Sequence, residues 1–397
     1  MNIQSRRSVF GKILGAAFLV STLVSPVSSA LAAEAIKIGQ ISALSGASAQ
    51  SGEAIARGLQ IAIDEINGKG GLLDGRKLEL IQRDDESKPP KGLLAARELI
   101  FNEKVAAFVG GIDSPVSLAI VPLANQEKIP FMGVWAAATG ITRNNANPNY
   151  VFRVSAVDAL VDVKLLNYAN AKFGAEKIGL MLINNPWGES NERGLEAADE
   201  ANDKVTIVGV EKFEAADVDM TPQLSRLKEA GAQAIVLVVN APPGAQMMKS
   251  RERMGWTVPV VSHWGISGGR FAELAGPTAG DAHFVQTYSF FGEQGDVGNH
   301  VIDVLKQKYG VNGPEEIFSP VGTANAYDAM HLLALAIQQA GSTDGDAIRQ
   351  ALENLNDEYA GLIKTYNKPF SAENHDALGP DDYLMVHYDE DQIVPTE

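Results

Sequence analysis

Ile66–Asp85 reads INGKGGLLDGRKLELIQRDD, and the order of elements in this stretch decides the fold class. Apolar residues from Ile55 to Ile66 follow the spacing of one helix face. Glycines at 68, 70 and 71 then end the helix in a turn, and Leu78–Ile81 is a short apolar run typical of a buried strand. In a dinucleotide-binding fingerprint the glycines open a helix instead. The stretch therefore predicts an α/β unit without a nucleotide site.

Strand-like and helix-like segments alternate along most of the chain, in one series before Tyr150 and a second after it. Such alternation predicts parallel sheets with helices on both faces. Of the 397 residues, the 365 that follow position 32 exceed what one hydrophobic core usually supports, so two α/β lobes are expected. The predicted strands include Ile36–Ile41, Leu78–Ile81, Ala106–Val109, Ile178–Ile183, Thr206–Val210, Ala234–Val239 and Val258–Ser262, and the predicted helices include one from about Glu189, Pro222–Ala230, Ala245–Met254 and Gly322–Ala340.

Residues 1–32 have the pattern of a removable export signal. Basic residues at 6, 7 and 12 precede the apolar run Ile13–Val24, and Ala30-Leu31-Ala32 supplies the small residues of a cleavage site. This apolar run is too short to span a bilayer, which takes about 20 residues. Because Arg6 and Arg7 partly match a twin-arginine signal, that route and the general secretory route both remain open.

The composition limits which compartment and which binding partners are expected. Cleavage after residue 32 removes three basic and no acidic residues, which moves the net charge from −16 to −19. Nucleic acids and anionic membranes both need a basic surface, so neither is an expected partner. Cysteine is absent, which excludes disulfides, thiolate metal sites and a lipid anchor on cysteine. We expect a freely diffusing periplasmic protein with no cofactor and no metal.

Ile66–Asp85 and the loop Gly110–Ser117 (GGIDSPVS) closely resemble parts of the branched-chain amino acid (Leu/Ile/Val) type of ABC transporter substrate-binding proteins, which are type I periplasmic binding proteins. The resemblance implies two Rossmann-like lobes with doubly wound parallel sheets, joined by a three-crossover hinge, with the ligand in the cleft between them. It assigns 34–154 plus 287–365 to the first lobe and 155–286 plus 366–397 to the second. It also implies a monomer without enzymatic activity that delivers a small molecule to an ABC permease in the inner membrane.

The predicted ligand site lies at loops rich in small residues. Ligands of open α/β sheets bind beyond the carboxyl ends of the strands, against helix N-termini with accessible backbone N–H groups. By resemblance, Ser114 contacts a ligand carboxylate and the segment from Ala136 to Thr139 completes the pocket, with Ala138 as an alternative to Thr139. Ser114 and Thr139 would otherwise only cap helices. The predicted contacts of the first lobe are Ser51, Asp113, Ser114, Trp135, Ala136, Ala138 and Thr139.

In the second lobe the resemblance places Trp187 over the ligand. Trp264 stands where amino-acid binders carry a glutamate for the ligand ammonium, and burying an ammonium without a carboxylate partner is costly. Three of the four tryptophans, including Trp135, fall at predicted cleft positions. We therefore expect a carboxylate-bearing ligand, with an aromatic acid favoured over an aliphatic acid, an amide or an amino acid. The predicted contacts of this lobe are Trp187, Asn240 (with Ala241 as an alternative), His263 (otherwise an ordinary loop histidine) and Trp264.

Two other functions are compatible with the sequence. Gly265–Gly269 (GISGG) fits the pattern G-x-S-x-G, in which Ser267 would be the nucleophile of a periplasmic serine hydrolase. However, His263 and Trp264 separate this motif from the strand that a nucleophile elbow should follow directly. The fold also serves ligand-sensing receptor modules. Because no output domain is expected after residue 364, the partner of such a sensor would be a separate regulator.

Overall fold

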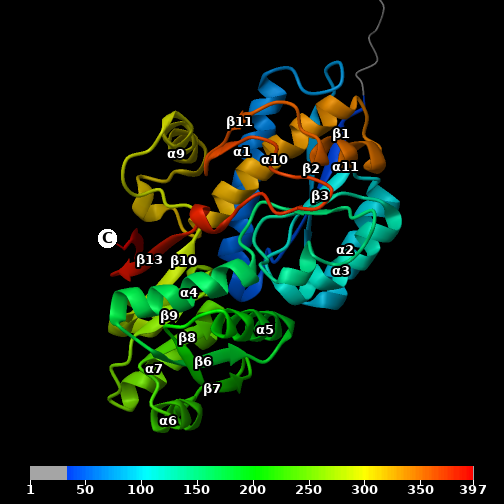
Figure 1. Cartoon of the computed structure of the whole chain (residues 1–397). Helices are drawn as coiled ribbons and strands as arrows, with labels where there is room; N and C mark the ends of the chain where they lie inside the picture. The colour runs from blue at the N-terminus through cyan, green and yellow to red at the C-terminus, as the bar shows by residue number, and fades with distance from the viewer. Residues whose placement is uncertain (1–33, 397) are drawn as a thin grey trace, which may run out of the picture. The chain divides into compact units, whose positions relative to one another are not determined.

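Two β-sheets organise the computed structural model, which describes residues 34–396 (Figure 1). The first sheet is entirely parallel, with the strand order β2-β1-β3-β4-β5. We call the part of the molecule built on this sheet the first lobe. Its strands are β1 (Ile36–Ser42), β2 (Leu78–Asp84), β3 (Ala107–Gly110), β4 (Phe131–Gly133) and β5 (Val151–Arg153). The predicted export signal lies outside the described residues.

The second sheet has the order β14-β13-β10-β9-β8-β6-β7, and the part of the molecule built on it is the second lobe. Its strands β6 to β10 are parallel, while β13 and β14 are antiparallel additions at one edge. The bounds are β6 (Lys177–Ile183), β7 (Thr206–Phe213), β8 (Ala234–Val238), β9 (Val260–Ser262), β10 (Ala282–Gln286), β13 (Leu384–Asp389) and β14 (Gln392–Pro395).

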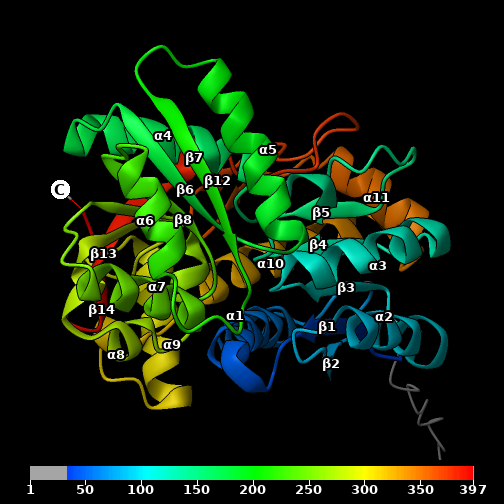
Figure 2. The ribbon, with the colours of Figure 1, turned by 90° about the horizontal axis from the view of Figure 1, so that it is seen from below.

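Helices cover both faces of the first sheet. The long helices α1 (Ala49–Gly68) and α10 (Pro320–Ala340) pack against each other, and α2 (Pro89–Glu98) packs against α3 (Ser114–Glu127) (Figure 2). Alternate residues of a strand point to opposite faces. Accordingly, Val109 of β3 joins the hydrophobic core that contains α1 and α10, whereas Phe108 joins the core that contains α2 and α3.

The second lobe has the same layered arrangement. In it α4 packs against α5, α7 packs against α8, and α6 lies against β7. The bounds are α4 (Asp158–Phe173), α5 (Pro186–Glu200), α6 (Thr221–Glu229), α7 (Ala241–Arg253) and α8 (Phe271–Ala275). The remaining α-helices are α9 (Asp296–Tyr309) and α11 (Gly345–Glu353), and the remaining strands are the pair β11 (Tyr359–Ala360) and β12 (Thr365–Tyr366).

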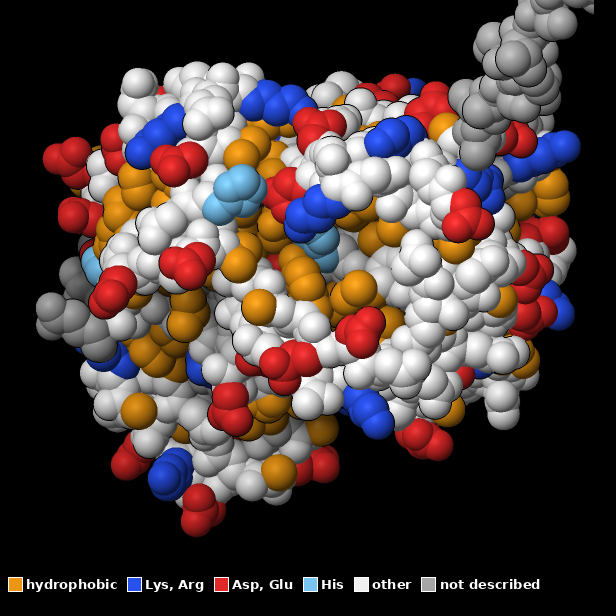
Figure 3. Space-filling view, turned by 90° about the horizontal axis from the view of Figure 1, so that it is seen from above, with side chains coloured by type: hydrophobic (Ala, Val, Ile, Leu, Met, Phe, Trp, Pro, Cys, Tyr) orange, Lys and Arg blue, Asp and Glu red, His pale blue; other side chains and the backbone are white. Residues whose placement is uncertain are grey.

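The predicted two-lobed α/β fold is confirmed. The chain leaves the first sheet after β5, leaves the second after β10, and re-enters it at β13, which gives three crossovers. The residue boundaries assigned to the two lobes stay a prediction. On the part of the surface that Figure 3 shows and the structure describes, acidic and basic side chains are intermixed, without the extended basic patch that nucleic acids need. Within residues 34–396, no helix is long and apolar enough to cross a bilayer.

Two helices begin earlier than the sequence predicted, and both changes affect the site. The helix expected from about Glu189 begins at Pro186, because the side chain of Asn185 caps it by accepting bonds from Trp187 N and Gly188 N. The helix expected from Ala245 begins at Ala241 with prolines in its first turn, a position where a missing N–H costs no helical bond. Both helix N-termini therefore lie beside the residues predicted to contact ligand.

Candidate functional site

Loops from both lobes enclose a small cavity at the ends of the parallel strands. The first lobe contributes loops after β3 and β4, and the second lobe contributes loops after β6, β8 and β9. We call this cavity the tryptophan pocket. It is lined by Ile112, Asp113, Ser114, Pro115, Trp135, Ala136, Ala137, Asn185, Trp187, Asn240 and Trp264. The pocket thus brings together seven of the eleven residues predicted from the sequence, while Ser51, Ala138, Thr139 and His263 lie outside its lining.

Ser114 presents a hydroxyl group at the start of α3. It is buried, and its Oγ accepts a hydrogen bond of 3.2 Å from the backbone N of Ala138. A hydroxyl that accepts in this way still has its own hydrogen to donate. The N-terminus of α3 also favours a negative charge nearby. The Ser114 hydroxyl can therefore donate a hydrogen bond to a ligand carboxylate. Ala138, which does not line the pocket, orients this hydroxyl through its backbone N–H.

Thr139 ties the first lobe to the second. Its backbone N donates to Ser190 Oγ at 3.1 Å, and its Oγ1 accepts from the backbone N of Ala159 at 3.1 Å. Both partners belong to helices of the second lobe. In this structure Thr139 links the two lobes beside the pocket and does not line it.

A carboxylate and an amide meet across the pocket. Asn240 Nδ2, at the N-terminus of α7, donates to Asp113 Oδ1 at 3.1 Å. The other oxygen, Asp113 Oδ2, is buried and has no hydrogen-bond partner among residues 34–396. Burial raises the pKa of Asp113 above its ordinary value. Asp113 can therefore receive a hydrogen-bond donor or hold a proton of its own.

Three tryptophans surround this polar group. The rings of Trp135 and Trp264 lie with their centroids 5.9 Å apart and their planes inclined by 45°, a favourable geometry for aromatic contact. Trp187 lines the same pocket and donates from Nε1 to Asp158 Oδ1 at 3.2 Å. All three side chains are buried. The fourth, Trp256, lies instead beside Lys228. The structure thus gathers the three predicted indole rings in one place.

His263 lies behind the pocket wall, and sequence reasoning did not identify its partner. Its Nδ1 accepts from the backbone N of Trp264 at 2.9 Å, so in the neutral ring the proton is on Nε2. Nε2 lies 3.0 Å from Asp158 Oδ1, and both side chains are fully buried. Asp158 therefore accepts a hydrogen bond from Trp187 and lies beside His263 Nε2, behind the pocket wall.

Arg153 is a second group that sequence reasoning missed. This fully buried residue ends the first sheet and donates from Nη1 to the carbonyl oxygen of Ala138 at 3.0 Å. It also donates to Asp376 Oδ1 at 2.9 Å and to Thr142 Oγ1 at 2.7 Å. Burial by itself raises the pKa of Asp376, but Arg153 and Thr142 outweigh burial and hold that pKa below its ordinary value. The ion pair fixes the Ala136–Thr139 segment against the last crossover of the chain.

Ser51 and Ser267 do not line the tryptophan pocket. Ser51 Oγ is 3.4 Å from Ser319 Oγ, and Ser267 Oγ donates to the carbonyl of Trp264 at 2.6 Å. Ser267 lies in a short 3-10 helix, Trp264–Ser267, that His263 separates from β9. A nucleophile elbow would place this serine directly after the strand. The geometry at Ser267 does not support the hydrolase alternative.

The pocket volume of about 20 Å³ is close to the space that one water molecule needs. A ligand with several heavy atoms enters only if the Trp135–Trp264 contact and the Asn240–Asp113 bond separate. These contacts join the two lobes, and the three crossovers provide the hinge for such a separation. Fold and site together define a two-lobed protein that binds a small molecule in the cleft between its lobes.

Comparison with known proteins gives the family. A family model described as periplasmic binding protein matches residues 35–391, and the chain belongs to this family. The Leu/Ile/Val-binding protein BraC3 of Rhizobium johnstonii is 25% identical over 338 residues, which cover 85% of this chain and 88% of that protein. The chain is thus an ABC transporter solute-binding protein of the Leu/Ile/Val-binding family, whose members bind small molecules and are not enzymes.

Solved structures show the same fold. A type 1 periplasmic binding protein from Bordetella pertussis Tohama I has a TM-score of 0.82 and 25% identity, over 91% of this chain and all of that one. A solute-binding protein of Rhodopseudomonas palustris in complex with 4-hydroxybenzoate has a TM-score of 0.76 and 20% identity, over 91% of this chain and 96% of that one. At that identity the second likeness concerns the fold alone.

Proposed function

We propose that this protein is a periplasmic solute-binding protein that delivers a small aromatic carboxylate to an ABC permease of the inner membrane. The observation that carries the proposal is the composition of the tryptophan pocket. The hydroxyl group of Ser114, which can still donate its hydrogen, lines the same pocket as three indole rings. A carboxylate accepts hydrogen bonds from such donors, and indole faces bury a flat apolar ring. The solute-binding protein of R. palustris, which has a similar fold, accommodates 4-hydroxybenzoate.

The proposed mechanism is closure of two lobes on the ligand. The carboxylate first binds the open first lobe at Ser114 and Ala136. Rotation about the crossovers then brings Trp187, Asn240 and Trp264 over the ring. Ligand stabilises the closed form only by its greater affinity for that form, and the permease recognises the closed protein. The protein acts as a monomer in the periplasm, after export by the secretory or the twin-arginine route.

Asp113 favours a second candidate, an amino acid. Its unpartnered Oδ2 is a carboxylate oxygen in the pocket, and an ammonium group could bind there in place of the missing glutamate. The raised pKa of Asp113 counts against this reading, because a protonated carboxyl attracts an ammonium far less. An aliphatic acid or an amide would use Ser114 but would fill the indole cluster less well.

A ligand screen followed by calorimetry tests the proposal. Residues 34–397 form one compact unit and can be purified without the signal. Benzoates should raise the melting temperature more than leucine, isobutyrate or isobutyramide do, and the rise should grow with the logarithm of the ratio of ligand concentration to Kd. A higher affinity for leucine than for the benzoates would assign the protein to the amino-acid binders instead. Saturation with none of them would reject the proposed ligand classes.

Substitution of Ser114 then tests the anchor. A hydrogen bond to a charged group contributes about 1.5–3 kcal/mol, so Ser114→Ala should weaken benzoate binding by about 10- to 100-fold. Ser117→Ala is the matched control, since Ser117 is buried on the same helix and does not line the pocket. Equal affinities of the two variants would show that the carboxylate binds elsewhere.

A further inference from the structure

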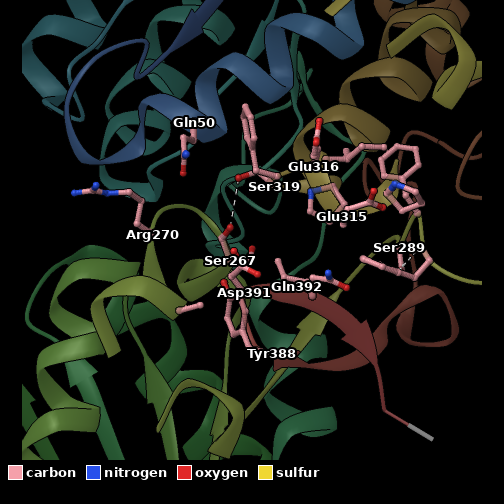
Figure 4. Close-up of a pocket in the computed structure, with 18 of the residues that line it drawn as sticks. Gln50, Ser267, Arg270, Ser289, Glu315, Glu316, Ser319, Tyr388, Asp391 and Gln392 are labelled. Carbon is pink, nitrogen blue, oxygen red and sulfur yellow. Dashed lines mark hydrogen bonds between the residues drawn. The ribbon is translucent and has the colours of Figure 1, made fainter. Parts of the chain in front are cut away.

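A second and larger cavity lies between the lobes, on the far side of the pocket wall. Its volume is about 280 Å³. Figure 4 shows Gln50 and Ser319 entering it from the first lobe, and Ser267, Tyr388 and Gln392 from the second. A cavity of this size accommodates a chain of several heavy atoms, which the tryptophan pocket does not.

The segment that follows Trp264 connects the linings of the two cavities. Gly268 lies between Ser267 and Gly269, which both line the second cavity. A Cβ atom added at Gly268 would lie 3.2 Å from Trp135 Cζ2, on the wall of the tryptophan pocket, and 2.7 Å from Ser51 Oγ. Gly268 and Ser51 therefore lie between the lining of the second cavity and Trp135, and we call these two residues the partition.

The hydroxyl groups that close this partition make weak bonds. Ser319 Oγ lies 3.4 Å from Ser51 Oγ and 3.4 Å from the carbonyl oxygen of Ser267, whereas strong O–H···O bonds measure about 2.7–2.8 Å. Ser319 is also held in a left-handed conformation with φ of 51°, which is unfavourable for a residue other than glycine and is frequent at ligand clamps. A hydroxyl or amine on a ligand can readily replace such contacts.

The charges around the second cavity define what can occupy it. Carboxylates of Glu273, Glu315, Glu316 and Asp391 lie at its rim. Glu316 is bonded by Asn312, which lowers its pKa and keeps it ionised at neutral pH. The guanidinium of Arg270 lies 3.3 Å from Glu273 and is already paired. The rim thus repels a second anion, while the interior offers hydroxyl and aromatic side chains such as Ser289 and Phe290.

We infer that the ligand is elongated, with its carboxylate in the tryptophan pocket and its far end in the second cavity, and that this far end carries a hydrogen-bond donor and no second carboxylate. The inference rests on the proposed function, because it takes Ser114 as the carboxylate anchor. It narrows the substrate class to aryl monocarboxylates with a hydroxyl- or amine-bearing substituent opposite the acid.

Three synthetic acids test the inference by calorimetry on residues 34–397. They are benzoate, 4-(3-hydroxypropyl)benzoate and 4-(2-carboxyethyl)benzoate, of which the last two have tails of equal length. The hydroxyl compound should bind about tenfold tighter than either of the others, since its tail gains contacts and avoids the acidic rim. Benzoate binding with no gain from the hydroxyl tail would overturn the inference and leave the proposed function standing. If none of the three acids binds, both the inference and the proposed function are contradicted.

Filling the second cavity provides an independent check. Gln392→Trp places an indole in this cavity from the edge strand β14, and Gln126→Trp places the same residue on the exposed side of α3 as a control. The first variant should lose about tenfold in affinity for the hydroxyl compound and less than about twofold for benzoate. Equal losses for both ligands, or an equal loss in the control, would contradict the inference.

Discussion

Replacement of Arg153 by methionine should destabilise this protein more than any exposed ion-pair change. Methionine keeps much of the volume of the arginine side chain but removes the positive charge that pairs with the Asp376 carboxylate, whose side chain is 4% exposed. Breaking a buried pair by removing one partner costs about 3–5 kcal/mol. Because Arg143 Nε remains 3.3 Å from Asp376, and Thr142 still donates to it, the lower end, about 3 kcal/mol, applies here.

Urea unfolding followed by circular dichroism measures this loss. Arg226→Met is the matched control, since Arg226 pairs with Glu211 on the surface, where an ion pair contributes at most about 1 kcal/mol. The double variant Arg153→Met/Asp376→Asn should recover part of the stability, because it removes the unpaired buried charge. If Arg153→Met unfolds at the same urea concentration as Arg226→Met, the ion pair does not hold the crossover as argued.

Two further predictions concern Asp85 and Trp264. Burial raises the pKa of Asp85 to about 7 from 3.8, so the folded protein retains a proton that the unfolded chain releases, and stability falls as pH rises between these values. The difference in free energy of unfolding between Asp85→Asn and the wild type should therefore increase in favour of the variant, by on the order of 3 kcal/mol, as the pH rises from 4 to 8. Urea unfolding at several pH values measures this difference, and a difference independent of pH would contradict the prediction. Trp264→Glu restores a carboxylate for an ammonium and removes an aromatic wall, so calorimetry should show leucine affinity rising by about tenfold and benzoate affinity falling. Unchanged leucine binding would mean that position 264 does not face the ligand.

The fold was largely predictable because its signals are local. Alternating apolar runs indicated the parallel strands, and β1 and β6 lie within one residue of their predicted bounds. In the antiparallel hairpin of β13 and β14, the second strand has only two strand-forming residues, Ile393 and Val394, between Gln392 and Pro395, which is too short a run to predict a strand by pattern. The helices α5 and α7 begin before their apolar periodic pattern does, because Asn185 caps α5 and prolines occupy the first turn of α7.

The residues of the candidate site also fall into a group that the sequence indicated and a group that it did not. Ser114 and the three tryptophans were indicated by their positions after predicted strands or within loops that the family resemblance identified. Arg153 and Asp376, in contrast, lie 223 positions apart. Asp158 and His263 belong to different strand–helix connections, and neither has a neighbour in sequence that marks the pair. No local pattern relates such residues, so their roles became visible only when the chain was folded.

The sequence by itself determined the fold class, because strand and helix periodicity and the order of turns are properties of short segments, and the class of protein followed from the family resemblance of such segments. Tertiary structure alone decided which side chains face one another: Asn240 against Asp113, Trp135 against Trp264, and Ser319 against Ser51. These contacts join segments separated by a hundred residues or more: the first two form only when the two lobes meet, and the third forms only when α1 and α10 pack together.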